Sequence, residues 1–128
     1  MTSILIAEGD RSVARLFAAV LEQQNWKVIS LHEASRVVEE LRGTERYDLL
    51  IVSYEVAGSN GVALIELARK LPHRKSLPIV MVTGTSGIDR LALAAGASEV
   101  LNKPIGIHEL VAVSRRRMAE AECQRVGC

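Results

Sequence analysis

Short apolar runs alternate with amphipathic segments along the whole chain. Five runs of four to six residues carry the β-branched and aliphatic side chains that favour strands. The predicted strands are Ser3–Ala7, Trp26–Leu31, Asp48–Ser53, Ile79–Thr83 and Ser98–Leu101. The third contains the unbroken apolar run from Leu49 to Val52. A strand without alternation is typical of a sheet that helices cover on both faces.

Between these runs, apolar residues recur at the three- and four-residue spacing of a helix. The first predicted helix begins at about Val13. The other four span Ala34–Leu41, Val62–Leu71, Ile88–Ala95 and Ile107–Ala121. Parallel strands need crossover connections, and helices supply them. Five strands that alternate with five helices therefore predict an α/β fold, a three-layer sandwich around a five-stranded parallel sheet.

The composition is typical of a single globular domain of 128 residues, of which 48% are hydrophobic and 24% charged. We expect the domain to occupy residues 1–121, and residues 122–128 to form a C-terminal tail or the start of a linker. Sixteen basic residues balance fifteen acidic ones. This balance gives no electrostatic support to nucleic-acid binding, so we expect no nucleic-acid partner for this domain.

The C-terminal segment carries a cluster of charge and both cysteines. The three arginines of residues 115–117 are matched by Glu120 and Glu122, which indicates a solvated helical face. Cys123 and Cys128 have no second pair that would complete a metal site. We therefore predict free thiols in a frayed tail.

No apolar run reaches the roughly eighteen residues that a membrane span requires. The first residues also lack the basic region and the long apolar segment of a signal peptide. We therefore expect a cytoplasmic protein with no membrane partner.

Polar residues follow four of the predicted strands at their carboxyl ends. They are Glu8-Gly9-Asp10 after the first strand, Ser53 at the end of the third, Thr83 at the end of the fourth and Lys103 after the fifth. In parallel α/β sheets, sites lie beyond the carboxyl ends of the strands, where the strand order reverses. These residues are therefore the candidates for a functional site.

Five segments near these strand ends form a series that is specific when taken in order. They are Ile4–Asp10, Tyr47–Ser53, Gly58–Gly61, Pro78–Gly84 and Ala95–Pro104. With this series the chain resembles a receiver domain of the bacterial response-regulator family over nearly its whole length. The resemblance implies a flavodoxin-like (βα)5 fold with strand order 2-1-3-4-5 and a role in two-component signalling.

In that family, a partner histidine kinase donates a phosphoryl group to an aspartate at the end of the third strand. Two acidic residues after the first strand hold Mg²⁺. A Thr or Ser after the fourth strand contacts the phosphoryl oxygens, and a Lys before a Pro after the fifth neutralises charge. Metal and ammonium stabilise the charge on the transferring oxygens, which is why the chemistry needs this set. Thr83 and Lys103 match the pattern.

The other site positions depart from the pattern. Ser53 stands at the phosphoacceptor position, and its hydroxyl cannot form an acyl phosphate. The acidic pair is Glu8-Gly9, so the second carboxylate is absent, and Asp10 is favoured as the cap of the first helix over a metal ligand. Since Mg²⁺ requires carboxylate oxygens in octahedral geometry, we expect no cofactor and weak or absent Mg²⁺ binding.

The positions that carry the output signal also depart from the family. Val100 stands where the family often has a rotating Tyr or Phe, and Ala57 replaces the usual Pro of the loop after the third strand. The segment from Thr83 to Gly96 is short, which predicts a shortened fourth helix. The family usually binds partners through the fourth helix, fifth strand and fifth helix. These departures therefore argue against dimerisation gated by phosphorylation.

We interpret the chain as an atypical receiver, or pseudo-receiver, that is not an enzyme and binds a partner protein or output domain without aspartyl phosphorylation. Two arrangements are open for Lys103 and Glu8, an ion pair that holds one conformation or two solvated charges. For Thr83 we favour a strand-end hydroxyl bonded to nearby backbone.

Two other interpretations are open. In one, Ser53 is a regulatory phosphoserine or an engineered replacement of aspartate, although a single replacement does not explain the loss at Gly9. In the other, a small hydrolase or transferase uses Ser53 as nucleophile and Lys103 as base. No Gly-rich elbow or evident oxyanion nest accompanies that pair in the sequence.

Overall fold

The central sheet consists of five parallel strands. The computed structural model describes residues 1–127, and Cys128 lies outside the described residues. The strands are β1 (Ser3–Ala7), β2 (Lys27–Leu31), β3 (Leu49–Ser53), β6 (Ile79–Thr83) and β7 (Glu99–Asn102). Their order is β2-β1-β3-β6-β7, which is 2-1-3-4-5 when only the strands of this sheet are counted. The predicted flavodoxin-like topology is confirmed.

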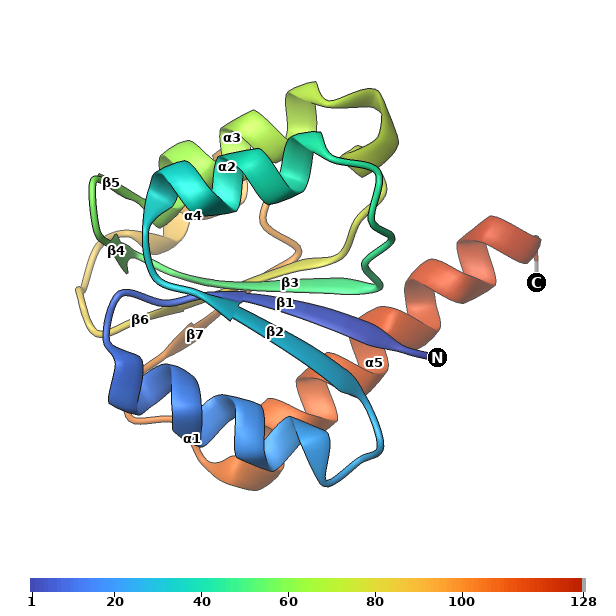
Figure 1. Cartoon of the computed structure of the whole chain (residues 1–128), viewed down its shortest axis with the longest axis horizontal. Helices are drawn as coiled ribbons and strands as arrows, with labels where there is room; N and C mark the ends of the chain where they lie inside the picture. Colours follow the sequence, from blue (N-terminus) through green and yellow to red (C-terminus); the bar gives the residue numbers. More distant parts are fainter. Residues whose placement is uncertain (128) are drawn as a thin grey trace.

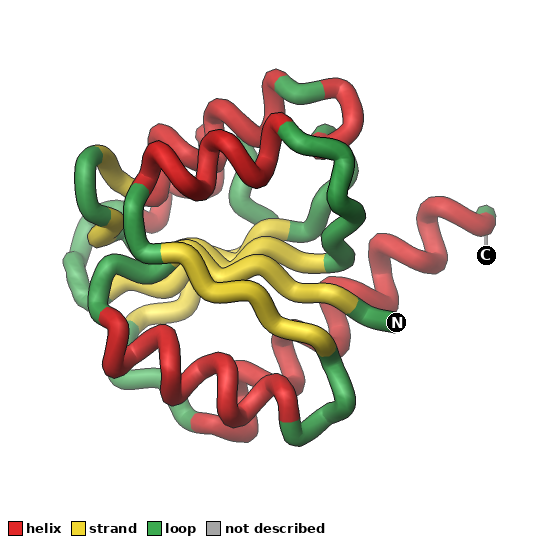
Figure 2. The backbone as a smooth tube through the Cα atoms, in the orientation of Figure 1, coloured by secondary structure: helices red, strands yellow, loops and turns green. Residues whose placement is uncertain are grey.

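Helices cover both faces of the sheet, so the predicted three-layer sandwich is also confirmed. Figures 1 and 2 show one group of helices on each face of the sheet. The first group is α2 (Ala34–Arg42), α3 (Gly61–Lys70) and α4 (Asp89–Ala95), and the second is α1 (Arg11–Glu22) and α5 (Ile107–Val126). The fourth helix, α4, has 7 residues and is the shortest α-helix among residues 1–127.

Alternate residues of each strand feed two separate hydrophobic clusters. In β1, Leu5 and Ala7 pack with residues of α2, α3 and α4, whereas Ile4 and Ile6 pack with residues of α1 and α5. Every residue of β3 and of β6 is buried, as the unbroken apolar runs predict. The core is therefore two layers of side chains, one on each side of the sheet.

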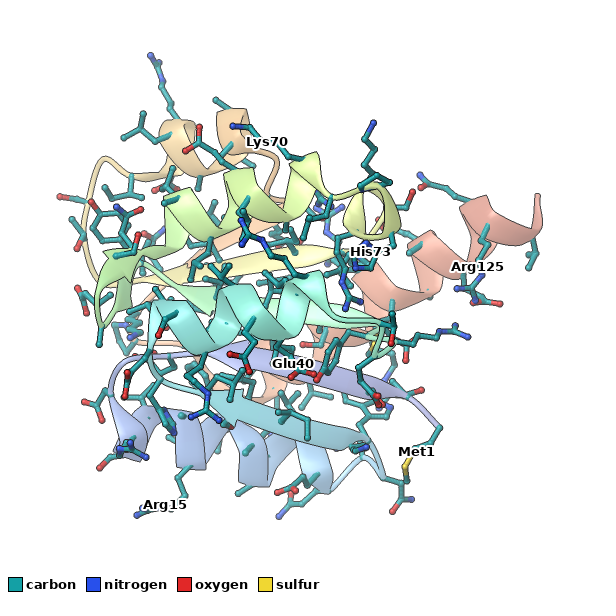
Figure 3. All side chains as sticks on the ribbon, turned by 45° about the horizontal axis from the view of Figure 1, so that its top comes forward. Met1, Arg15, Glu40, Lys70, His73 and Arg125 are labelled. Carbon is teal, nitrogen blue, oxygen red and sulfur yellow. The ribbon has the colours of Figure 1, made fainter. Side chains whose placement is uncertain are left out.

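The C-terminal end of α2 is held by side chains from the 3-10 helix η1 (Pro72–Arg74). The Nε of Arg74 donates to the carbonyl of Leu41 at 2.9 Å, and the Nε2 of His73 donates to the carbonyl of Gly43 at 2.9 Å. Carbonyls at a helix end have no partner within the helix, so these donors satisfy them. Figure 3 labels His73 on η1 and Glu40 on α2.

A short antiparallel hairpin follows β3, in a segment that the sequence analysis treats as a loop. Its strands are β4 (Glu55–Val56) and β5 (Ser59–Asn60). Gly58 occupies the turn with φ +89°, a conformation that favours glycine. The side chain of Asn60 then accepts a hydrogen bond from the amide of Ala63 at 3.0 Å and caps α3.

The last helix is longer than the sequence analysis predicts. α5 continues to Val126 instead of ending at Ala121, and its C-terminal half projects past the sheet in Figure 1. Cys123 lies within this helix and is not a free thiol, so the prediction of a free thiol in a frayed tail is wrong for it; Cys128 lies outside the described residues. The domain boundary at residue 121 stays a prediction.

Within residues 1–127, no helix is both long and apolar enough to span a bilayer.

Candidate functional site

The predicted site residues gather at the carboxyl edge of the sheet, on the left in Figure 1. Glu8 directly follows β1, Ser53 ends β3, Thr83 ends β6, and Lys103 directly follows β7. Since these four strands are consecutive neighbours in the sheet, the fold brings together residues that are far apart in the sequence. All four sit at the strand ends where the topology predicts a site.

Glu8 is the centre of a buried hydrogen-bond network. Its side chain is 1% exposed, and its Oε1 accepts hydrogen bonds from the Oγ of Ser53 and from the Nζ of Lys103, the latter at 3.2 Å. The other carboxylate oxygen, Oε2, accepts from the backbone amide of Asp10 at 2.9 Å. Both oxygens of the carboxylate are therefore occupied by donors of the chain itself.

Of the two arrangements open for Lys103 and Glu8, the structure contains the ion pair. The Lys103 side chain is 25% exposed, so its ammonium reaches the buried carboxylate from the rim of the site. Ser53 is 2% exposed and donates its hydroxyl to the same oxygen. We name these three residues the Glu8–Ser53–Lys103 network.

Thr83 does not join this network. Its Oγ1 accepts a hydrogen bond from the amide of Thr85 at 2.9 Å, within the loop that follows β6. The hydroxyl is buried and held by local backbone, which is the arrangement favoured for a strand-end threonine. The structure therefore brings Glu8, Ser53 and Lys103 into contact and leaves Thr83 beside them.

Asp10 caps α1. Its Oδ1 accepts from the amides of Ser12 at 2.8 Å and Val13 at 3.2 Å, which satisfies two backbone donors that the first helical turn leaves free. The side chain is exposed and points its oxygen at the helix rather than at Glu8. This is the capping role that the sequence favours.

Gly9 has no room for a side chain. Its amide donates to the carbonyl of Glu55 at 3.0 Å, and a Cβ built on Gly9 would lie 2.8 Å from that same carbonyl oxygen. A contact this short with backbone requires one of the two loops to move. The missing second acid is therefore accompanied by a close approach of the β4 segment, which the sequence analysis did not foresee.

Comparison with known proteins decides the family. The family described as "Response regulator receiver domain" matches residues 4–115, which is most of the chain. The chain belongs to the receiver domain family. It is 32% identical over 114 residues to the response regulator ArlR of Staphylococcus aureus, and the match covers 88% of this chain and 50% of ArlR. The receiver therefore spans about half the length of that curated relative.

Solved receiver structures have the same fold. A CheY-like receiver domain protein from Methanospirillum hungatei JF-1 has a TM-score of 0.90 at 24% identity, covering 97% of this chain and 98% of the other. The receiver domain of the sensor histidine kinase PA1611 from Pseudomonas aeruginosa PAO1 has a TM-score of 0.85 at 21% identity, covering 92% and 98%. That second structure holds a magnesium ion in its active-site cleft.

The acidic content of this receiver's site is low. In the part of the chain that the structure describes, no group of three or more His, Cys, Asp or Glu side chains is placed to hold a metal ion. Glu8 is the one carboxylate among the buried residues of that part. With the ammonium of Lys103 beside it, the buried site carries about equal positive and negative charge.

Val100, which the resemblance to the family assigns to the switch position, has an aliphatic side chain. Val100 lies in β7 beside Met81 of β6 and packs, partly buried, against the cluster that faces α4. An isopropyl group has no hydroxyl to bond and no ring to rotate. The position therefore contributes packing.

Sequence reasoning missed two residues that contact the site through backbone atoms. The Nδ1 of His32 donates to the carbonyl of Glu8 at 2.9 Å, and the carbonyl of Glu55 accepts from Gly9. Bonds to main-chain carbonyls leave no residue-type signature, so a single sequence gave no signal for Glu55. For His32, its position directly after β2 was the only indication.

Proposed function

We propose that this receiver domain is a pseudo-receiver, a signalling module that binds a partner protein without phosphorylation of an aspartate. The observation that carries the proposal is the Glu8–Ser53–Lys103 network. A serine hydroxyl occupies the phosphoacceptor position and is donated to Glu8, while the lysine that would neutralise a phosphoryl group is paired with the same carboxylate. We place the module in a bacterial pathway of the two-component type, in the cytoplasm, because of its family and its sequence.

The residues at the site do not fit a Mg²⁺ ion. Octahedral Mg²⁺ keeps several waters and usually takes at least one or two carboxylate oxygens. Here the oxygens of Glu8 already accept from Ser53, Lys103 and the Asp10 amide. We therefore propose that this domain works without the metal.

Neither rival interpretation gains support from the geometry. Ser53 is 2% exposed, so a protein kinase that modifies serine has no access to its hydroxyl in this conformation. For a hydrolase, Lys103 would have to accept the proton of Ser53. Its Nζ instead donates to Oε1 of Glu8, and the Ser53 hydroxyl donates to the same oxygen, so Lys103 is not placed to accept that proton.

The partner surface that we propose combines α4 with the first turns of α5. Leu91 and Leu93 of α4 are 58% and 52% exposed, an apolar pair on a short helix. Arg90 on α4 and Glu109 on α5 are exposed charges at its edge, and neither forms an ion pair with another described residue. An exposed apolar centre with a charged rim is typical of a protein interface.

The proposal is tested by incubating the protein with acetyl phosphate and Mg²⁺ and measuring its intact mass. We expect no phosphoryl adduct, whereas a receiver with the complete acidic set gains one under the same conditions. An adduct that maps to residues 49–60 would show that this site accepts phosphoryl groups and would overturn the proposal.

The surface is tested separately with a partner recovered from the source organism. Arg90→Glu and Glu109→Lys are expected to weaken that partner's binding by about fivefold or more, the effect of an interface residue that costs about 1 kcal/mol or more. Ser53→Ala should leave the affinity unchanged. If Ser53→Ala alone abolished binding, the strand-end site would carry recognition instead.

A further inference from the structure

The loop after β3 is joined to neighbouring loops at the carboxyl edge of the sheet by backbone and side-chain hydrogen bonds. The segment Glu55–Asn60, which contains the β4–β5 hairpin, lies in this loop, and we name it the strap. On one side the carbonyl of Glu55 accepts from the amide of Gly9, in the loop after β1, at 3.0 Å. On the other side the side chain of Glu55 accepts from the hydroxyl of Thr85, in the loop after β6, at 3.5 Å.

The strap is also joined to the loop after β2, through both backbone groups of Ala57. The amide of Ala57 donates to the carbonyl of His32 at 3.3 Å, and its carbonyl accepts from the amide of Ala34 at 2.8 Å. These bonds form an isolated parallel bridge between Glu33 and Ala57. The strap thus contacts the loops after β1, β2 and β6 at once.

Two of these joints depend on residues that depart from the family pattern. The joint to β1 needs a residue without a Cβ at position 9, because a Cβ there would lie 2.8 Å from the Glu55 carbonyl oxygen. The joint to β2 needs a backbone N–H at position 57, and a proline, which is usual in the family at Ala57, has none. Gly9 and Ala57 look unrelated in the sequence but act on the same strap.

We infer that Gly9 and Ala57 allow the strap to close permanently over the loops around the Glu8–Ser53–Lys103 network, so that the site is held in one conformation. The inference deepens the proposed function, because it names what fixes the site that the proposal treats as inactive. The strap is attached close to two residues of the network, Glu8 and Ser53. The amide of Gly9 follows Glu8 directly, and the strap begins two residues after Ser53.

If the strap stays closed, the amides that form its hydrogen bonds to the neighbouring loops exchange slowly with solvent, because exchange requires local opening. In the unsubstituted protein we expect the amides of Gly9, Ala34 and Ala57 to exchange at least about tenfold more slowly than the amide of Gly58. Gly58 lies at the tip of the same strap, and its amide donates to no other group in residues 1–127. Residue-resolved NMR exchange, without phosphodonor or Mg²⁺, measures all four.

Two substitutions test the residue dependence. Gly9→Ala is expected to accelerate exchange of the amides of residue 9, Ala34 and Ala57 by about tenfold or more, and Ala57→Pro that of Gly9 and Ala34. The matched control for the first is Gly106→Ala, because Gly106 has φ −69° and nothing lies within 4 Å of its added Cβ. The control for the second is Ala57→Ser, which keeps the N–H. Both controls should retain the protection.

Equal exchange of Ala57 and Gly58 in the unsubstituted protein would overturn the strap, even if a variant failed to fold. The strap would also be overturned if a folded Gly9→Ala variant showed the same slow exchange at these amides as the Gly106→Ala control. A phosphoryl adduct in the mass experiment would instead overturn the proposed function and leave the strap standing. The two failures are therefore distinguishable.

Discussion

The ammonium of Lys103 lies 3.2 Å from Oε1 of Glu8, although 95 positions separate the two residues in the sequence. The two partners differ in burial, since the Glu8 side chain is 1% exposed and that of Lys103 is 25% exposed. Removing a carboxylate from water costs several kcal/mol unless a partner compensates for it. Glu8 therefore depends on Lys103 more than Lys103 depends on Glu8.

This asymmetry predicts that Lys103→Met destabilises the protein more than Glu8→Gln. Without Lys103 the buried carboxylate loses its counter-charge, and we expect the free energy of unfolding to fall by about 1–3 kcal/mol. With Glu8→Gln the amide oxygen still accepts hydrogen bonds, and the ammonium reaches water through its exposed part. Urea denaturation at neutral pH measures both effects.

The control for Lys103→Met is Lys70→Met, since Lys70 is exposed and forms no ion pair among residues 1–127. The control should change the stability by less than about 0.5 kcal/mol. If the two variants were equally stable, the pair would behave like solvated charges and would not hold the site.

A second prediction concerns the phosphoacceptor position. Ser53→Asp places a second carboxylate against the buried Glu8, whose one ion-pair partner among residues 1–127 is Lys103. Two carboxylates in direct contact repel strongly in a buried site, so we expect a loss of about 1–3 kcal/mol in the free energy of unfolding. Ser53→Asn has the same shape without the charge and should cost less.

The response of these variants to millimolar Mg²⁺ shows whether the site can or cannot hold a metal ion. Because a Cβ at Gly9 would meet the Glu55 carbonyl, Gly9→Asp does not simply restore the missing metal ligand. We expect Mg²⁺ to leave the stability of Ser53→Asp unchanged, and Gly9→Asp/Ser53→Asp to recover little of the loss. Recovery of wild-type stability in Mg²⁺ would show that a metal site re-forms.

Local signals in the sequence were sufficient to predict the three layers of the fold, whereas the strand order came from the resemblance to receiver domains. The apolar runs of β3 and β6, and the helical spacing between them, identify a parallel sheet covered on both faces. The site residues were predictable for a related reason. Once the strands are placed, Glu8, Ser53, Thr83 and Lys103 must meet at one edge of the sheet.

Contacts that depend on main-chain geometry or on long side chains were not predictable. The joint between Gly9 and Glu55 involves backbone atoms, which carry no residue-type signal. The arginines of residues 115–117 were matched with Glu120 and Glu122 by their spacing along a helix. In the structure, Arg116 and Arg117 do pair with Glu120, as the spacing predicts. Both also reach Glu99 of β7, and Glu122 pairs with Arg125 instead.

A third prediction concerns Ser114 in α5. Its hydroxyl is fully buried, and its Oγ has no hydrogen-bond partner within the described part of the chain. A buried polar group without a partner is destabilising, and alanine is the better helix former. We expect Ser114→Ala to raise the free energy of unfolding by about 0.5–1 kcal/mol in urea denaturation.

Ser98→Ala is the matched control for this change and should have the opposite sign. The Oγ of Ser98 accepts from the amide of Ile79 at 3.1 Å, so its loss leaves a backbone donor of β6 without that partner. Should Ser114→Ala prove destabilising like Ser98→Ala, the Ser114 hydroxyl must be bonded, for instance by a buried water.

The last prediction uses pH to test the charge network between β7 and α5. Burial alone would raise the pKa of Glu99, but hydrogen bonds from Arg116 and Arg117 outweigh it and lower the pKa below its ordinary value. A carboxyl group whose pKa is lower in the folded state stabilises the fold at pH values above its unfolded pKa. That stability is lost as the pH falls through the folded pKa.

Wild type should therefore exceed Glu99→Gln in stability at pH 7, by up to about 1 kcal/mol because the arginines are partly exposed. The difference should disappear only once the pH is below the lowered folded pKa, where the carboxyl group is protonated in both states. Glu120→Gln should show a smaller difference at pH 7, since Glu120 is 51% exposed. A Glu99→Gln effect that stayed constant from pH 7 to pH 3 would mean that packing, and not charge, connects β7 to α5.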